Sequence, residues 1–179
     1  MLEGLDEISW SQLEHAYGDA SDVPFLIRQL LSKDNAIVDK AVYELFGNIW
    51  HQGTVYEASA TAVPFLQEVF KSPEINAKTR KSLACLLASM ADGYDIKDGS
   101  YAAETRIAVE KEVQLLFPYL FCDVPVVRES VAGALSRYPQ YVEETLPMLE
   151  KALASESDEE AKEKITEAIE KLKSEQAKL

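Results

Sequence analysis

The sequence predicts an all-α fold built from repeated helical pairs. Helical periodicity runs through nearly the whole chain, prolines recur in one short frame, and the alternation typical of β-strands is absent. The chain has 179 residues, of which 47% are hydrophobic and 27% are charged. This is long enough for one domain with a substantial core. We therefore expect residues 1–179 to form a single helical domain.

The stretch "DNAIVDKAVYELFGNIW" shows the periodicity best. Its apolar residues recur every three or four positions and define one broad face: Ile37, Val38, Ala41, Val42, Leu45, Phe46 and Ile49. Asp34 or Asn35 can cap its start, because a side-chain oxygen accepts a hydrogen bond from a free backbone amide. The same reasoning predicts helices at 9–17, 22–32, 35–52, 55–71, 75–91, 101–121, 124–137, 140–154 and 158–177.

A four-residue frame of apolar residue, proline, apolar residue and leucine occurs four times, at Pro24, Pro64, Pro118 and Pro147. In each case a short polar break and a second amphipathic helix follow. A unit that recurs in this way predicts helical pairs that stack on one another, because a single pair cannot bury its apolar face alone.

The repeat that contains "CDVPVVRESVAGALSRYP" resembles those of the HEAT-repeat family. In that family a proline-containing helix is followed by a turn with an aspartate and by a helix that opens with Val-Arg. Asp123, Val127 and Arg128 match these positions, whereas Asp39 stands where the first repeat would have its arginine. The stretch "HQGTVYEASATAVPFL" is similar to a corner in bacterial HEAT-repeat proteins of undetermined role. The resemblance implies a right-handed α-solenoid of about four helical pairs, whose second helices line a concave groove.

Two segments stand apart from the repeats. Residues 91–101 contain glycines and aspartates typical of turns and are predicted to form an inserted loop. The aspartates lack the alternate spacing of a calcium-binding loop, so we expect a connector, with a binding loop as the alternative. Residues 157–179 are predicted to form a capping helix, because Ser157 and Glu160 have capping-box spacing and the outer face is polar.

The corner "HQGTVYEASATAVPFL" has a largely structural interpretation. Gly53 is expected to end the preceding helix in the left-handed conformation, with His51 in the last turn of that helix. Thr54 and Glu57 are spaced as a capping box for the next helix. Pro64 is expected inside that next helix, where it removes a backbone donor.

A binding role for the corner is the alternative. Trp50, Gln52 and Tyr56 have no structural role in this interpretation, and with His51 and Glu57 they are candidates for an aromatic and polar cluster at the mouth of the groove. Tryptophan and tyrosine are favoured as anchors in protein interfaces.

The second helices supply further candidates for partner binding. We expect acidic and polar groups on one side of the groove and cationic groups on the other: Asp39, Glu44 and Asn48, and Arg80, Arg128 and Arg137. The family resemblance offers a different role for Arg128, which is a bond to Asp123 across its own turn.

The net charge of −13 limits the classes of partner. A nucleic-acid binder needs a basic stripe, and the basic cluster at 71–81 is small, so we expect no nucleic acid and favour a basic protein partner.

No stretch approaches the roughly 20 apolar residues that a membrane helix needs. The acidic start lacks the features of a secretory signal, and Cys85 and Cys122 suggest reduced thiols, so a cytoplasmic location is expected.

The motifs of common enzymes are missing from the sequence. Neither of the two histidines lies in a recognisable nucleophile frame, and no glycine-rich phosphate loop is present. We therefore predict a monomeric, non-enzymatic protein-binding scaffold without a cofactor or a metal. One alternative is an acidic immunity or antitoxin-type protein that neutralises a basic toxin. The other is a lyase or DNA-processing enzyme on a HEAT scaffold, by analogy with alkylpurine DNA glycosylases.

Overall fold

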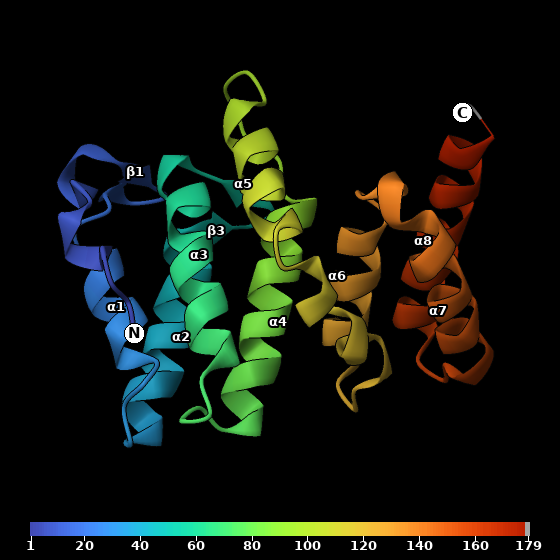
Figure 1. The fold of residues 1–179 in the computed structure, drawn as a ribbon, viewed down its shortest axis with the longest axis horizontal. Helices are drawn as coiled ribbons and strands as arrows, with labels where there is room; N and C mark the ends of the chain where they lie inside the picture. The colour runs from blue at the N-terminus through green and yellow to red at the C-terminus, as the bar shows by residue number, and fades with distance from the viewer. Residues whose placement is uncertain (178–179) are drawn as a thin grey trace.

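The computed structural model describes residues 1–177, and these are mostly helical (Figure 1), so the prediction of an all-α fold is confirmed. The α-helices are α1 (Val23–Gln29), α2 (Asn35–Asn48), α3 (Glu57–Lys71), α4 (Ala77–Asp92), α5 (Ser100–Glu110), α6 (Pro125–Leu135), α7 (Val142–Ser155) and α8 (Glu159–Gln176). Short 3-10 helices are η1 (Leu5–Glu7), η2 (Trp10–Gln12), η3 (Val113–Leu115), η4 (Phe117–Phe121) and η5 (Pro139–Tyr141).

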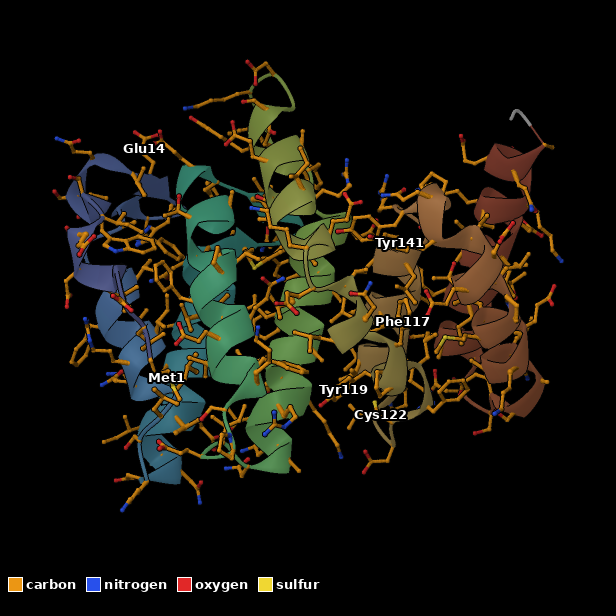
Figure 2. All side chains as sticks on the ribbon, viewed as in Figure 1. Met1, Glu14, Phe117, Tyr119, Cys122 and Tyr141 are labelled. Atoms are coloured by element: carbon orange, nitrogen blue, oxygen red, sulfur yellow. The ribbon has the colours of Figure 1, made fainter. Side chains whose placement is uncertain are left out.

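The helices follow one another along the long axis of the molecule in chain order, from the N-terminus at one end to the C-terminus at the other (Figure 1). Helix α2 packs on α4, α4 on α6, and α6 on α8. On the other side of this row, α3 contacts α1 and α5, and α7 contacts η4. Side chains occupy the space between neighbouring helices along the whole length (Figure 2). No helix within residues 1–177 is both long and apolar enough to cross a membrane.

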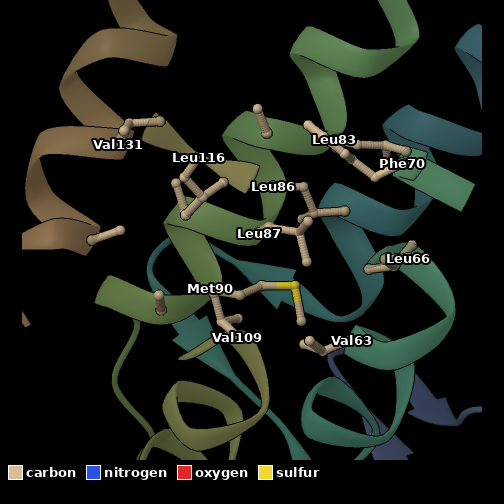
Figure 3. Close-up of a cluster of buried hydrophobic side chains, with 14 of the residues drawn as sticks. Val63, Leu66, Phe70, Leu83, Leu86, Leu87, Met90, Val109, Leu116 and Val131 are labelled. Carbon is tan, nitrogen blue, oxygen red and sulfur yellow. The ribbon is translucent and has the colours of Figure 1, made fainter. Parts of the chain in front are cut away.

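Helix α4 lies at the centre of the core. Its fully buried side chains include Leu83, Leu86 and Met90. Met90 lies beside Val63 of α3 and Val109 of α5, and Leu83 lies beside Phe70 of α3 (Figure 3). Because α2, α3, α5 and α6 all pack against it, α4 is covered on several sides. Burying one such side chain contributes about 1.5–3 kcal/mol.

The predicted helix at 9–17 is wrong. This segment forms η2 and then a small antiparallel hairpin of β1 (Glu14–His15) and β2 (Gly18–Asp19). Gly18 has φ 128°, which a helix cannot contain. A segment this short is a marginal helix in any case, and the buried Trp10, whose indole donates to the Leu5 carbonyl at 2.8 Å, fixes it in place instead.

The helix predicted at 35–52 ends at Asn48. Strand β3 (Trp50–His51) follows and pairs with β4 (Thr54–Val55). Gln52 has φ 50° and Gly53 has φ 91°, which are the two successive positive values that a type I′ hairpin turn requires. The roles expected for Gly53 at a helix end, and for His51 in a last helical turn, are therefore wrong, and the expectation that strands are absent fails here.

Both predicted capping boxes are also wrong. Helix α3 begins two residues later than expected, and the Tyr56 amide donates to Ser59 Oγ at 2.7 Å. At α8 the carboxylate of Asp158, rather than Ser157, accepts a hydrogen bond from the Ala161 amide at 3.1 Å. In each case the cap lies within two residues of the predicted one, because several neighbouring polar residues can serve.

The proline frame marks different structural positions. Pro24 lies in the first turn of α1, and Pro118 in the first turn of η4. Pro64 and Pro147 lie inside α3 and α7, as expected for Pro64. The helix predicted at 101–121 is divided, because α5 ends at Glu110 and two 3-10 segments follow.

The inserted loop is shorter than predicted and spans Gly93 to Gly99 between α4 and α5. Asp95 organises it, since its carboxylate accepts hydrogen bonds from the amides of Lys97, Gly99 and Ala102 at 3.1, 2.9 and 2.9 Å. These bonds, led by that of Ala102, hold the pKa of Asp95 below its usual value. The loop acids thus satisfy backbone donors at the start of α5.

Arg128 joins α6 to the turn between α7 and α8. Its guanidinium forms two hydrogen bonds of 2.6 Å with the Glu156 carboxylate, and the two side chains are only 13% and 3% exposed. A third bond, of 2.8 Å, reaches the Cys122 carbonyl. The bond between Arg128 and Asp123 suggested by the resemblance is wrong, because the exposed Asp123 pairs with Lys81 instead.

Replacing Glu156 by glutamine is expected to lower the free energy of unfolding by about 2 kcal/mol, since a bidentate charged pair is lost. Hydrogen bonds from Arg128 lower the pKa of Glu156 from 4.5 to about 2. The difference between wild type and variant should therefore be complete above pH ~5 and should shrink as the pH falls toward 2. Chemical denaturation at several pH values measures the loss of stability and its dependence on pH.

The matched control is Glu159→Gln, which removes an exposed acid paired with Lys162 and should cost less than about 1 kcal/mol. Equal losses for the two variants at pH 7 would contradict the structural role of the Arg128–Glu156 pair.

Candidate functional site

A groove of about 660 Å³ crosses the row formed by α2, α4, α6 and α8. A second hollow of about 460 Å³ shares Phe46, Cys85 and Val126 with it, so the two form one continuous groove. The groove side chains named below come from these helices, from β3 and from the loop after α4. Helices α2, α4 and α6, which cover most of the predicted helices 35–52, 75–91 and 124–137, all contribute side chains to it.

One wall of the groove is apolar. The rings of Phe46 and Trp50 meet edge to face, with centroids 5.9 Å apart, an arrangement that favours aromatic pairs. Tyr94 and Val126 also line the groove and remain 56% and 53% exposed. Exposed apolar side chains that converge on one concavity are typical of interaction sites.

The floor of the groove is neutral and made of short side chains. Ser130 Oγ lies 3.4 Å from both Cys85 Sγ and Ser89 Oγ, and it donates to the Val126 carbonyl at 2.9 Å. Burial raises the pKa of the Cys85 thiol, which keeps it protonated at neutral pH. Cys85 and Cys122 are both free cysteines. The short side chains leave the groove open.

Glu129 gives the groove an acidic edge. This half-buried carboxylate makes no hydrogen bond or salt bridge with any residue of 1–177. Burial raises its pKa, and repulsion from Glu160 and Asp158 raises it further. A cation supplied by a partner would offset this rise in the pKa, because a nearby opposite charge favours the ionised form. Within the described residues no group of three or more histidine, cysteine or acidic side chains is placed to hold a metal.

The predicted corner is divided between two surfaces. Trp50 lines the groove, and its indole nitrogen is buried with no hydrogen-bond partner among the described residues. His51 instead contacts Tyr17, with 3.3 Å from Nδ1 to the tyrosine hydroxyl and 5.5 Å between the rings. Successive side chains of a strand point to opposite sides, so one binding cluster cannot include both residues.

Asn48 is part of a buried network rather than of the groove. Its side chain donates to Asp22 at 2.6 Å, and its carbonyl accepts the Ala16 amide at 3.0 Å. Asp22 is also 3.0 Å from His15 Nε2, and the Tyr17 amide donates to His15 Nδ1 at 3.1 Å. The neutral imidazole therefore carries its proton on Nε2. The network fastens the first hairpin to α2.

The remaining corner residues hold the second hairpin. Gln52 occupies its turn, and Glu57 accepts a hydrogen bond from the Glu14 amide at 3.3 Å; Glu14 lies at the β1 end of the molecule (Figure 2). Tyr56 stands at the start of α3, where burial raises its pKa and the nearby Tyr17 raises it further. These contacts explain the corner as a junction between two hairpins.

Tyr94 adds a third backbone segment to this junction. Its carbonyl accepts the Val55 amide at 2.8 Å, and its amide donates to the Gly53 carbonyl at 3.0 Å. Its ring lies directly over Gly53, where an added Cβ would be only 2.9 Å from a ring carbon. The 93–99 loop is thereby fixed to the hairpin at the edge of the groove.

The predicted acidic anchors have partners within the chain. Asp39 pairs with Lys78 at 2.6 Å, and Glu44 lies 3.6 Å from Lys40 one turn earlier on α2. Both pairs are exposed, and such pairs contribute less than about 1 kcal/mol. A partner could displace them at little cost.

The predicted arginine anchors are more firmly engaged. Arg80 donates to the Ser72 carbonyl at 2.9 Å and to the Phe70 carbonyl, and so closes the end of α3. Arg128 is held by its buried acid as described above, and these two roles are structural. Arg137 is exposed and pairs with Asp92 at 2.5 Å through Nε.

Several side chains that define the groove were not predicted from the sequence, namely Phe46, Tyr94, Val126 and Glu129. Phe46 had a detectable signal, because it lies four residues before Trp50 and shares its side of α2. The other three depend on how α4, α6 and the 93–99 loop meet, and no local pattern indicates that.

No protein-family profile and no curated protein sequence matches the chain. Solved structures do match, and one of them is the crystal structure of an engineered protein. It superposes with a TM-score of 0.60 at 20% identity, over 87% of this chain and 64% of the engineered protein. The chain thus spans 64% of the length of that protein. A likeness at this identity supports the helical fold alone.

Replacing Gly53 by alanine is expected to destabilise the protein for two reasons. Gly53 has φ +91°, which costs an alanine about 1–2 kcal/mol, and the new methyl group would also displace the Tyr94 ring. Gly99→Ala is the control, because Gly99 has a similar φ of +86° with nothing within 4 Å. Thermal denaturation should show Gly53→Ala to be worse by about 1 kcal/mol or more. Equal effects would mean that Tyr94 does not rest on the hairpin.

Proposed function

We propose that this protein is a non-enzymatic binding scaffold of the HEAT-like solenoid type, which docks another protein in the groove across α2, α4, α6 and α8. The succession of contacts from α2 to α8 supports the solenoid, since each helix of that row packs on the next. We further propose that it acts as a monomer in the cytoplasm.

The partner is a basic protein segment that carries an apolar side chain. Glu129 offers a carboxylate that forms no ion pair within residues 1–177, and Val126, three residues earlier on the same helix, offers exposed apolar surface beside Phe46. The juxtaposition of these two chemistries in one groove is the observation that carries the proposal. The net charge of −13 favours the approach of such a partner from a distance.

The same charge supports a more specific candidate, an immunity or antitoxin-type protein that neutralises a basic toxin. Charge complementarity would then dominate the affinity, and binding would weaken steeply with salt, because the screening length falls from about 10 Å at 0.1 M to about 3 Å at 1 M. A scaffold that relies on the apolar wall would lose much less affinity over this range. The lysines that line the groove are each paired with an acid of the chain, so the groove offers no free basic stripe for a DNA-processing role.

Peptide display against the immobilised protein tests the proposal. We expect the selected peptides to combine lysine or arginine with an aromatic or large aliphatic residue. Val126→Ser should weaken the best peptide about tenfold, which corresponds to about 1.4 kcal/mol of lost apolar burial and packing. Isothermal titration calorimetry at two salt concentrations measures the affinity and its electrostatic part.

Ile107→Ser is the matched control, because Ile107 on α5 is 58% exposed, close to the 53% of Val126, and does not line the groove. It should leave the peptide affinity unchanged. Peptides that bind both variants equally, or a selection with no basic preference, would overturn the proposed site.

A further inference from the structure

A separate small pocket of about 140 Å³ lies between α6 and α8, beyond the end of the groove. Asp92 and Lys164 line both cavities and form the boundary between them. Three cationic side chains line this pocket, Arg137, Lys164 and Lys171, against two acids. In a chain of net charge −13, such a local excess of positive charge is unexpected.

Of these cations, Lys171 alone has no carboxylate partner among the described residues. Its ammonium lies 3.4 Å from Ser136 Oγ and makes no salt bridge with a carboxylate of residues 1–177. The Ser136 hydroxyl donates to the Gly133 carbonyl at 2.7 Å, so it accepts from Lys171 and positions it. Burial lowers the pKa of Lys171, and repulsion from Arg137 and the nearby Arg106 lowers it further.

Asp92 already serves as an internal anion for the other two. Its carboxylate oxygens lie 2.5 Å from Arg137 Nε and 3.9 Å from Lys164 Nζ. Gly133 allows this approach, since an added Cβ would be 2.9 Å from the Asp92 carboxylate. Lys164 has a second acid, Glu167, at 3.4 Å. The remaining guanidinium nitrogens of Arg137 make no hydrogen bond within the described chain, and Lys171 has no anion.

Stabilisation of helix ends explains part of this cluster. Cations favour helix C-termini, and Arg106 donates to the Ala91 carbonyl near the end of α4 at 3.2 Å, while Arg137 lies just beyond the end of α6. This reason does not apply to Lys171, which lies in the last turns of α8 and reaches across to Ser136 rather than to a carbonyl of its own helix.

We propose that this pocket binds a small phosphate-class oxyanion, with Lys171 and Arg137 as its charged donors and Lys164 at its rim. Charge-assisted hydrogen bonds from such donors are short and strong, and a guanidinium matches the geometry of phosphate oxygens. The volume of about 140 Å³ is below the roughly 300 Å³ of pockets for drug-sized ligands. The ligand is therefore a free anion or the phosphate group of a small monoester, since the pocket is too small to enclose the sugar and base of a nucleotide. The inference is independent of the groove function.

Calorimetric titration with inorganic phosphate, at constant ionic strength in chloride, tests this site. Lys171→Gln should weaken binding about tenfold or more, as expected for loss of a charged hydrogen bond. Lys173→Gln is the control on the same helix, because Lys173 pairs with Glu150 at the surface at 2.9 Å, and it should bind phosphate like wild type. Arg137→Gln provides a second loss variant, and circular dichroism checks the fold of each.

Asp92→Asn gives the sharpest test, because it should bind phosphate roughly threefold more tightly once a competing negative charge is removed. A gain of affinity cannot arise from a damaged fold. Phosphoserine in place of phosphate separates the two sources of the group: equal affinity assigns the pocket to a monoester, and weaker affinity to the free anion. Absence of phosphate binding by wild type, or equal weakening by the Lys171 and Lys173 variants, would overturn the proposal.

Discussion

The burial of helix α4 from several sides is the constraint on which the rest of the structure depends. Its large apolar side chains, including Leu83, Leu86 and Met90, are buried in the core. The middle of its groove side therefore consists of short residues such as Cys85 and Ser89, while charged residues of α4 line the groove toward the two ends of the helix. Helix α4 lies between α2 and α6 and contacts both. The groove is thus a consequence of how the core is filled.

Two elements outside the row of helices shape the groove. The β3–β4 hairpin extends α2 and places Trp50 beside Phe46, while the 93–99 loop places Tyr94 over Gly53. Both are fixed by backbone hydrogen bonds rather than by long side chains. A binding surface held in this way loses little conformational freedom when a partner arrives, which favours affinity.

The sequence predicted the helical class and most helix positions, because periodic burial in helices of this length is a strong local signal. It failed where a short segment had two competing local structures, as at Gln52 and Gly53, whose turn was mistaken for a helix end. Trp50 was identified as a groove residue, but its neighbour His51 was wrongly grouped with it. Glu129 and Lys171 could not be recognised, since their lack of an oppositely charged partner among the described residues is visible only after distant helices pack.

The central claim is that the groove, and not the hairpin junction, receives a basic partner. Amide chemical-shift mapping with a selected basic peptide tests this most directly. The account predicts shifts concentrated at Phe46, Trp50, 85–94 and 126–130, with little change at Tyr17 and His51. Shifts concentrated at Tyr17 and His51, or spread evenly over the acidic surface, would contradict it.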